Sequence, residues 1–320
     1  MMKIVECVPN FSEGRDIDKI ERIMSVVKSD KFVKLVNYES DADYNRTVVT
    51  LIGEPKKMID LILKLTEVCL EEIDLNHHTG EHARMGAIDV IPFIPISDVT
   101  MKECVDYANE CAKRISEEYN IPTYLYAKAA KFEERISLPN IRKGEFEGMK
   151  TKILEPEWKP DFGEAKIHPT FGCVAVGARD FLIAYNIDLQ TEDITPTKNI
   201  AKVIRKSSGG FQYIQAGPVY LENRGHTQVT MNILNYKKNP IYRIFETVKM
   251  EALRYHIKVT GAEIIGLVPK DALVRSLKYY YEVNNLKMPE EYSLKQIVED
   301  VSKYMLFRDF SEEKIIEYFL

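Results

Sequence analysis

The same order of predicted elements, strand-helix-strand-strand-helix-strand, occurs twice along this chain, once in each half. Apolar residues recur at helical spacing where helices are predicted, and β-branched or alternating runs mark the strands. The first copy has predicted strands at 4–8, 32–37, 46–52 and 87–93 and predicted helices at 17–27 and 55–68. The second copy has predicted strands at 181–188, 211–221, 227–234 and 261–268 and predicted helices at 195–207 and 241–256. A repeated order of this kind restricts the fold to two similar units.

This order is that of the ferredoxin-like split βαβ unit. Its helices cover one sheet face and leave the other to be buried by something else. We therefore expect an α+β protein of two ferredoxin-like (βαββαβ) subdomains packed together, with helices outside and a ligand cleft between them. We place the subdomains at residues 1–178 and 179–320, since 320 residues suit two domains. Residues 101–152 extend the first subdomain, residues 159–172 connect it to the second, and residues 297–320 form a helical cap.

Composition and charge exclude several classes of protein. The formal net charge of −5 gives no overall attraction to nucleic acid or to an anionic membrane. No apolar run approaches the roughly 18 residues that a membrane helix needs, and the early acidic residue Glu6 argues against a signal peptide. The five cysteines form no C-x-x-C pair, which favours buried thiols in a reducing cytoplasm. No glycine-rich nucleotide motif is present. We expect a cytoplasmic protein that binds no nucleic acid, membrane or nucleotide.

The densest polar cluster lies at residues 76–89 and contains three of the six histidines. Residues 78–82 match the H-x-x-E-H string of inverted zinc peptidases, a chemistry that requires both histidines on one face of a helix. Gly80 and Gly86 disfavour such a helix, so we expect no metal here. A second use of a histidine is proton transfer near neutral pH. A third interpretation, without chemistry, is that the histidines cap the preceding helix or lie in a solvated loop.

Further polar residues flank the predicted strands. Asn10, Asn45 and Arg46 lie in loops of the kind that often line a site on a rigid sheet, and Asp41 and Asp43 share the second of these loops. Taken alone, each of them is more often turn chemistry or a surface ion pair.

Two segments bounded or opened by glycine also have both a functional and a structural interpretation. Residues 163–172 precede a predicted strand at 173–176, and Arg179 lies in a turn at 177–180. Each segment suits either a ligand loop at a domain junction or a plain connection.

Several stretches together resemble the formiminotransferase domain family. They are ECVPNFSEG at 6–14, NRTV at 45–48, GEHARMGA at 80–87, DFG at 161–163, GAR at 177–179 with FLIAYN at 181–186, and GLVP at 266–269. The match extends over residues 3–320, and long motifs in a consistent order make it specific. Bifunctional members carry a cyclodeaminase domain after this point, so the resemblance is to a stand-alone form and we expect no cyclodeaminase activity.

The resemblance implies an activity and a site. The family's enzymes move a formimino group from N-formiminoglutamate to N5 of tetrahydrofolate, a co-substrate, with neither metal nor nucleotide. His82 matches the catalytic histidine, Ala83 replaces a usual proline, and the acidic site residue falls at Glu39. The folate-binding segment corresponds to Gly163, Glu164, Ala165, Lys166, Ile167, His168, Pro169, Thr170, Phe171 and Gly172. The family also implies a homodimer.

The residues suit this chemistry. His82 can take a proton from N5 of tetrahydrofolate and deliver it to the departing glutamate nitrogen. Arg84 can bind a carboxylate bidentately, and Asp41 or Glu39 can hold His82 in a useful tautomer. These four residues form the expected catalytic set. The expected substrate-binding residues are Asn10, Asn45, Arg46 and Arg179.

Other functions stay open at this point. One is a related folate one-carbon enzyme that acts on a formyl donor or on 5-formyltetrahydrofolate. Another is a non-catalytic folate-binding protein, and a third is a zinc hydrolase based on the H-x-x-E-H string.

Overall fold

A computed structural model describes residues 3–42, 44–80, 82–221 and 224–320. The chain divides after Asp180 into unit 1 and unit 2, each with its own sheet and hydrophobic core. This mixture of helices and largely antiparallel sheets confirms the α+β class. All five cysteines are free and buried, as predicted. None of the described helices is long and apolar enough to cross a membrane. The packing of the subdomains on each other, with a cleft between them, stays a prediction.

Unit 1 contains a ferredoxin-like core. Its elements are β1 (Ile4–Cys7), α1 (Ile17–Lys28), β3 (Val33–Asp41), β4 (Arg46–Gly53), α2 (Pro55–Glu72) and β5 (Ile88–Ser97). β1 pairs antiparallel with both β4 and β5, and β3 pairs antiparallel with β4. The order β5-β1-β4-β3 follows, and the short β2 (Asn10–Phe11) also pairs with β4 and β5. This is the split βαβ arrangement that the sequence predicts.

Two parallel strands extend this sheet. β7 (Val174–Ala178) pairs parallel with β5, and β6 (Thr123–Ala127) pairs parallel with β7. The intervening helices are α3 (Met101–Tyr119), α4 (Leu138–Arg142) and α5 (Glu145–Lys152). Residues 159–172, predicted to connect the units, instead fold within unit 1, because the strand that follows them pairs with β5.

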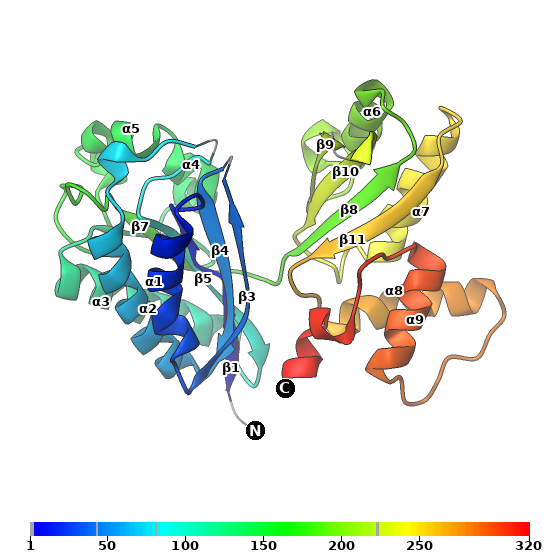
Figure 1. The fold of residues 1–320 in the computed structure, drawn as a ribbon, viewed down its shortest axis with the longest axis horizontal. Coiled ribbons are helices and arrows are strands. Elements are labelled where there is room, and N and C mark those ends of the chain that lie inside the picture. Colours follow the sequence, from blue (N-terminus) through cyan, green and yellow to red (C-terminus); the bar gives the residue numbers. More distant parts are fainter. Residues whose placement is uncertain (1–2, 43, 81, 222–223) are drawn as a thin grey trace. The chain divides into compact units, whose positions relative to one another are not determined.

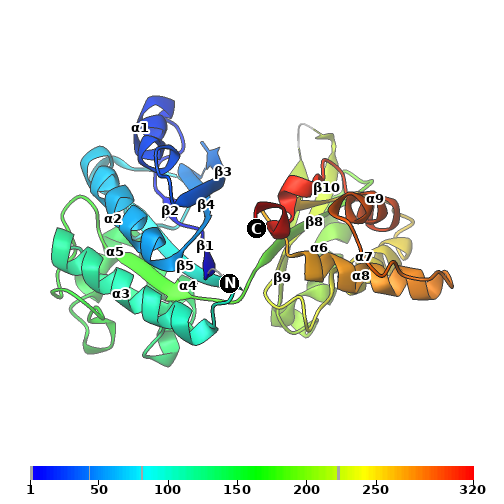
Figure 2. The same cartoon turned by 90° about the horizontal axis from the view of Figure 1, so that it is seen from below.

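The three long helices α1, α2 and α3 lie side by side over one face of this sheet (Figure 1, Figure 2). In α2, the side chain of Glu54 caps the N-terminus and Pro55 occupies the first turn. Met58, Ile62 and Leu65 of this helix are fully buried at helical spacing. These helices therefore seal one face with apolar side chains, and polar residues of the opposite face are left to form a site.

Unit 2 repeats the arrangement. Its elements are β8 (Ile183–Leu189), α6 (Ile194–Ile204), β9 (Ile214–Leu221), β10 (His226–Ile233), α7 (Ile241–Leu253) and β11 (Val259–Ile265). The antiparallel order β11-β8-β10-β9 matches the order of the core of unit 1.

Two further helices, α8 (Lys270–Val283) and α9 (Leu294–Met305), complete unit 2. The helical cap predicted for residues 297–320 is wrong beyond Met305. Leu306 adopts a left-handed conformation with φ 56°, which ends the helix. Short 3-10 turns occupy part of the remaining chain.

Candidate active site

Three loops of unit 1 meet at one edge of its sheet. β5 and β7 run parallel, and β4 runs in the same direction because β2 is antiparallel to both β4 and β5. The loops that precede these three strands therefore reach the same edge. Backbone hydrogen bonds join two of them, since Ala87 donates to the carbonyl of Phe171 (2.8 Å) and Cys173 donates to that of Met85 (3.0 Å). The histidine-rich cluster thus lies beside the end of the segment 163–172.

Two motif glycines permit this close approach. A Cβ atom on Gly86 would lie 2.1 Å from the carbonyl oxygen of Cys173, and one on Gly172 would lie 2.2 Å from that of Met85. Gly172 also has φ +82°, a conformation that side chains disfavour. Glycine is therefore a requirement of the loop junction at both positions.

Asn45, a predicted substrate-binding residue, ties the third loop to this edge. Its Nδ2 donates to the carbonyl of Thr79 (2.9 Å), and its Oδ1 accepts from the backbone of Gly14 (2.9 Å). The residue is buried and has φ 51°. Both polar ends of its side chain are thus used within the protein.

The other predicted site residues lie on strands and share one face of the sheet. Asp41 of β3 pairs with Arg46 of β4. Val48 of β4 pairs with Glu39 of β3 on one side and with Asn10 of β2 on the other. Since side chains two residues apart on a strand share a face, the four predicted residues come together. The alternate residues of β4 face the hydrophobic core. Asp43 and Glu81 lie outside the described residues.

His82 is one of the buried polar residues at this edge. Its exposed fraction is 7%, and its Nδ1 has no hydrogen-bond partner among the described residues. Burial, followed by the charges of Arg142 and Arg46, lowers its pKa to about 3. The ring is therefore neutral near physiological pH.

The two predicted orienting acids make other contacts. Oε1 of Glu39 accepts a hydrogen bond from Asn37 (2.9 Å), and Oδ1 of Asp41 accepts one from the backbone of Tyr44 (2.9 Å). Neither acid bonds to Nδ1 of His82. They lie on the face of the sheet that carries the site, but they do not orient the ring through that atom.

Arg84 is bound within the protein. Its guanidinium holds both carboxylate oxygens of Glu147 (2.7 and 2.9 Å) and one of Glu145 (2.7 Å), both from α5. These charges hold the pKa of Arg84 above its usual value despite burial. The side chain predicted to bind a substrate carboxylate already binds two carboxylates of its own chain.

His78 is also fully engaged. Its Nε2 donates to the carbonyl of Asn45 (2.9 Å), and its Nδ1 accepts from Nε of Arg84 (3.3 Å). No helix includes the described residues 78–80 and 82–87. The geometry that H-x-x-E-H zinc chemistry needs, two ring nitrogens on one helix face, is therefore missing from this segment.

The site contains an ion pair that sequence reasoning missed. Asp89 is fully buried; its Oδ1 accepts from the backbone of Met85 (2.9 Å), and its Oδ2 accepts from Nε (2.7 Å) and Nη2 of Arg142. An acid at the start of a buried strand, directly after a glycine motif, was a signal for Asp89. Arg142, on a short helix 53 residues away, had none.

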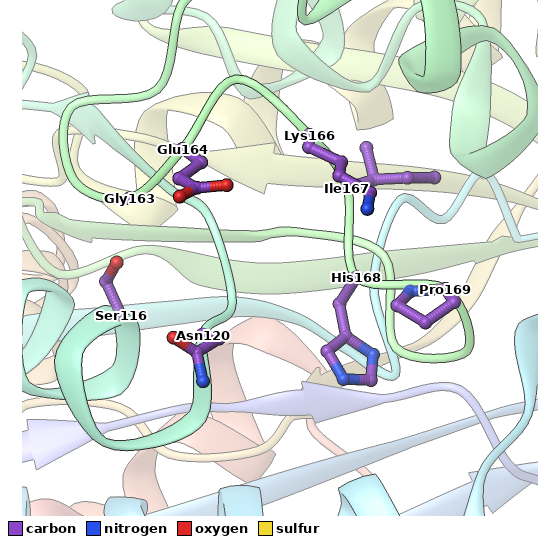
Figure 3. Close-up of a pocket in the computed structure, with 8 residues that line it drawn as sticks. All are labelled: Ser116, Asn120, Gly163, Glu164, Lys166, Ile167, His168 and Pro169. Atoms are coloured by element: carbon purple, nitrogen blue, oxygen red, sulfur yellow. The ribbon is translucent and has the colours of Figure 1, made fainter.

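The predicted folate segment has two parts. Ala165, Ile167 and Phe171 pack against the core. A pocket of about 300 Å³ lies beside residues 163–169 of the segment (Figure 3). The pocket is lined by Ser116 and Asn120 at the end of α3 and by Gly163, Glu164, Lys166, Ile167, His168 and Pro169. Nδ1 of His168 accepts from the backbone of Phe171 (3.2 Å), and Thr170 bonds to the backbone of Leu75.

Arg179 lies away from this edge. It follows the last residue of β7, so it belongs to the opposite end of the parallel strands. There its backbone donates to Phe93 (3.1 Å). Its charge partly offsets the burial that raises the pKa of Glu6 to about 7. The structure does not bring Arg179 together with His82.

The fold and the site define an α+β protein with a buried histidine and buried arginine ion pairs at one edge of its first sheet. The sequence of residues 4–179 matches the protein-family model for the formiminotransferase domain, N-terminal subdomain. Residues 184–320 match the family model for the formiminotransferase domain. The chain belongs to the formiminotransferase family.

Proteins of similar sequence carry names of the same family. A glutamate formimidoyltransferase of Streptococcus pyogenes serotype M1 is 47% identical over 285 residues, which cover 89% of this chain and 95% of the relative. One of Thermoplasma acidophilum is 44% identical over 88% of this chain and 94% of the relative. A formimidoyltransferase-cyclodeaminase of Gallus gallus is 38% identical over 99% of this chain and 60% of the relative.

Proposed function

We propose that unit 1 holds the catalytic residues of a glutamate formimidoyltransferase, with His82 as the general acid and base. The chain is a folate-dependent transferase that moves a formimino group from N-formimino-L-glutamate to N5 of tetrahydrofolate. The products are 5-formiminotetrahydrofolate and glutamate. The observation that supports the role of His82 is its buried ring at the junction of the site loops, with an Nδ1 that has no hydrogen-bond partner among the described residues.

The proposed mechanism has two steps. N5 of tetrahydrofolate attacks the amidine carbon of the donor, and neutral His82 takes the proton that N5 must lose. The tetrahedral intermediate then collapses when His82 returns this proton to the glutamate nitrogen, which leaves as the amine. Proton transfer of this kind contributes typically about 10²–10⁴-fold, and holding the two substrates in place contributes much of the rest.

We assign tetrahydrofolate to residues 163–172 and the donor to the sheet face with Arg46. Two facts support the first assignment: the pocket beside Gly163–Pro169, and the hydrogen bonds that join the end of this segment to the His82 loop. Arg84 has a positioning role, because its guanidinium holds the loop to α5. Asn10, Glu39 and Asp41 border the donor on the same face.

The activity test uses pure protein with tetrahydrofolate and either N-formiminoglutamate or N-formylglutamate. We expect rapid transfer from the first donor. Transfer only from the formyl donor, or only activity on 5-formyltetrahydrofolate, would instead indicate the related one-carbon enzyme.

The role of His82 is tested by His82→Asn. We expect a loss of about 10²–10⁴-fold in kcat with folate affinity largely kept. A variant that keeps full transfer would exclude proton transfer by His82. If the wild type binds folate but transfers nothing from any donor, the chain is a folate-binding protein without catalysis.

We also propose that each chain consists of subdomains 1–178 and 179–320, and that two such chains form a homodimer in the cytoplasm. The edges of split βαβ sheets can pair, and bacterial and archaeal relatives are consistent with a cytoplasmic setting. Light scattering tests the dimer, since a monomer mass would exclude it.

A further inference from the structure

Two guanidinium groups lie close to His82 at the candidate site. Apart from burial, Arg142 is the strongest influence on the pKa of both His82 and Arg46, and it lowers both values. Arg142 of α4 also binds Oδ2 of Asp89, whose Oδ1 accepts a hydrogen bond from the backbone of Met85 in the His82 loop (2.9 Å). Arg46 begins β4 and directly follows Asn45, whose carbonyl binds His78 of the same loop.

The positive charge of this pair is only partly offset. Nε and Nη2 of Arg142 both bind the single oxygen Oδ2 of Asp89, which leaves Nη1 outside that ion pair. Nε of Arg46 is buried and has no hydrogen-bond partner among the described residues. Asp41, which is exposed, lies opposite Arg46 and offsets part of its charge. Buried donors without acceptors are costly, so this geometry favours an added anion.

Arg84, a third arginine beside the site, does not compete for that anion. Arg84 is saturated by Glu145 and Glu147. The backbone N–H of Met85 donates a hydrogen bond to Oδ1 of Asp89, and this bond holds the carboxylate in place for its ion pair with Arg142. A fixed Asp89 in turn fixes the direction of the Arg142 guanidinium.

We propose that Arg142 and Arg46 each bind one carboxylate of the donor, and that Arg142 determines its selectivity for a dicarboxylic amino acid. The proposal rests on the function proposed above and deepens it. Asp89 is the positioning residue that aims Arg142.

The chemistry of the donor fits this pair. N-Formimino-L-glutamate carries two carboxylates, and guanidinium groups bind carboxylates through paired hydrogen bonds. A donor with one carboxylate would leave one guanidinium of the pair without an acceptor, at a cost. The two contacts also hold the amidine carbon at a defined place beside His82.

The test compares Arg142→Gln and Arg142→Lys with the wild type. A matched control is Arg114→Gln, which changes a partly exposed arginine of α3 that pairs with Asp60 and Glu118. Loss of a charged hydrogen-bond partner predicts that Arg142→Gln raises the KM of N-formiminoglutamate about 10- to 100-fold. The KM of tetrahydrofolate should stay within about twofold, and Arg142→Lys should recover part of the loss. An unchanged donor KM, or equal increases for both substrates, would overturn the proposal.

Amide donors separate binding from a structural effect. In the wild type, replacing either the α- or the γ-carboxylate of the donor by a carboxamide should lower kcat/KM. In Arg142→Gln, one of the two replacements should cost nothing further, because its partner is already gone. If both replacements cost as much in the variant as in the wild type, Arg142 binds neither carboxylate. If Arg142→Gln does not fold, the same comparison is made with Arg142→Lys, which keeps a cation beside Asp89.

One measurement does not depend on turnover. Calorimetric titration with L-glutamate, the amino-acid product, should give about 10- to 100-fold weaker binding to Arg142→Gln than to the wild type. If the wild type transfers no formimino group, the proposed function fails, while this titration still supports or overturns the dicarboxylate site. Equal binding to both proteins would overturn it.

Discussion

Arg84 and Glu147 form a two-bond ion pair that attaches the His82 loop to α5. Nη2 and Nη1 of Arg84 lie 2.7 and 2.9 Å from the two carboxylate oxygens of Glu147. The loop has no regular secondary structure of its own at these residues, so this pair supplies part of its rigidity. The guanidinium of Arg84 is thus occupied by carboxylates of its own chain.

The two partners of this ion pair should differ in their effect on stability. Arg84 is buried, and Arg84→Gln removes bonds to Glu145, Glu147 and His78, so we expect a loss of about 1–3 kcal/mol in the free energy of unfolding. Glu147 is exposed, and Glu147→Gln should cost less than about 1 kcal/mol. Urea denaturation measures both, with the exposed Glu155→Gln as the control.

Enzyme kinetics then separate position from binding at Arg84. We expect Arg84→Lys to lower kcat while the KM of the donor stays nearly constant. A large increase in donor KM, at unchanged stability, would show that Arg84 binds the substrate after all.

Gly172→Ala should destabilise unit 1. The new Cβ would lie 2.2 Å from the carbonyl oxygen of Met85 in a backbone with φ +82°, and strain of this kind costs about 1–3 kcal/mol. The matched control is Gly148→Ala in α5, where a Cβ meets no atom within 4 Å and alanine favours the helix. Urea denaturation of both variants should give opposite signs. Equal midpoints would mean that the junction between the two loops is loose.

His82 should make the protein less stable in acid. Its native pKa of about 3 lies below the ordinary value of 6.5, so the unfolded chain binds the extra proton between these values. The stabilisation is complete above the unfolded pKa and decreases as the pH falls, by at most about 1.4 kcal/mol per unit.

The pH dependence is measured by urea denaturation at about pH 7.5 and about pH 5.5. His82→Asn should lose less stability over this interval than the wild type, and the exposed His77→Asn should behave like the wild type. Identical pH dependence of the wild type and His82→Asn would exclude a depressed pKa. In Arg142→Gln the pKa of His82 should rise, because a cation beside it is removed.

Arg308 should be important for unit 2. Its Nε and Nη2 bind Asp188 (2.8 Å) and Glu263 (2.7 Å), which lie on neighbouring strands. Arg308→Gln leaves the buried Asp188 with less compensation, so we expect a loss of about 1–3 kcal/mol. Thermal unfolding tests this against Arg275→Gln, which changes an exposed pair on α8. Nε2 of Gln228 also donates to Asp188 (2.7 Å), and Nε2 of His226 lies 3.4 Å from the same carboxylate. Similar melting temperatures would show that these two residues satisfy Asp188 without Arg308.

Local patterns of the sequence were sufficient for most elements. Helical spacing predicted α1, α2, α6 and α7, because apolar periodicity acts within a few residues. The twofold strand-helix order predicted both ferredoxin-like cores. Gly80 and Gly86 correctly argued against a helix around His82. The motifs by themselves marked His82 and the segment 163–172 as candidates.

Tertiary pairing decided how these parts meet. The parallel pairing of β5 with β7 brings two distant loops to one edge, and it places residues 159–172 within unit 1 rather than between units. The sequence determined the elements and the chemical groups, since those depend on neighbours along the chain. The fold alone determined that Arg84 faces Glu147 and that Arg142 meets Asp89, because ion pairs between distant segments leave no periodic signal in a single sequence.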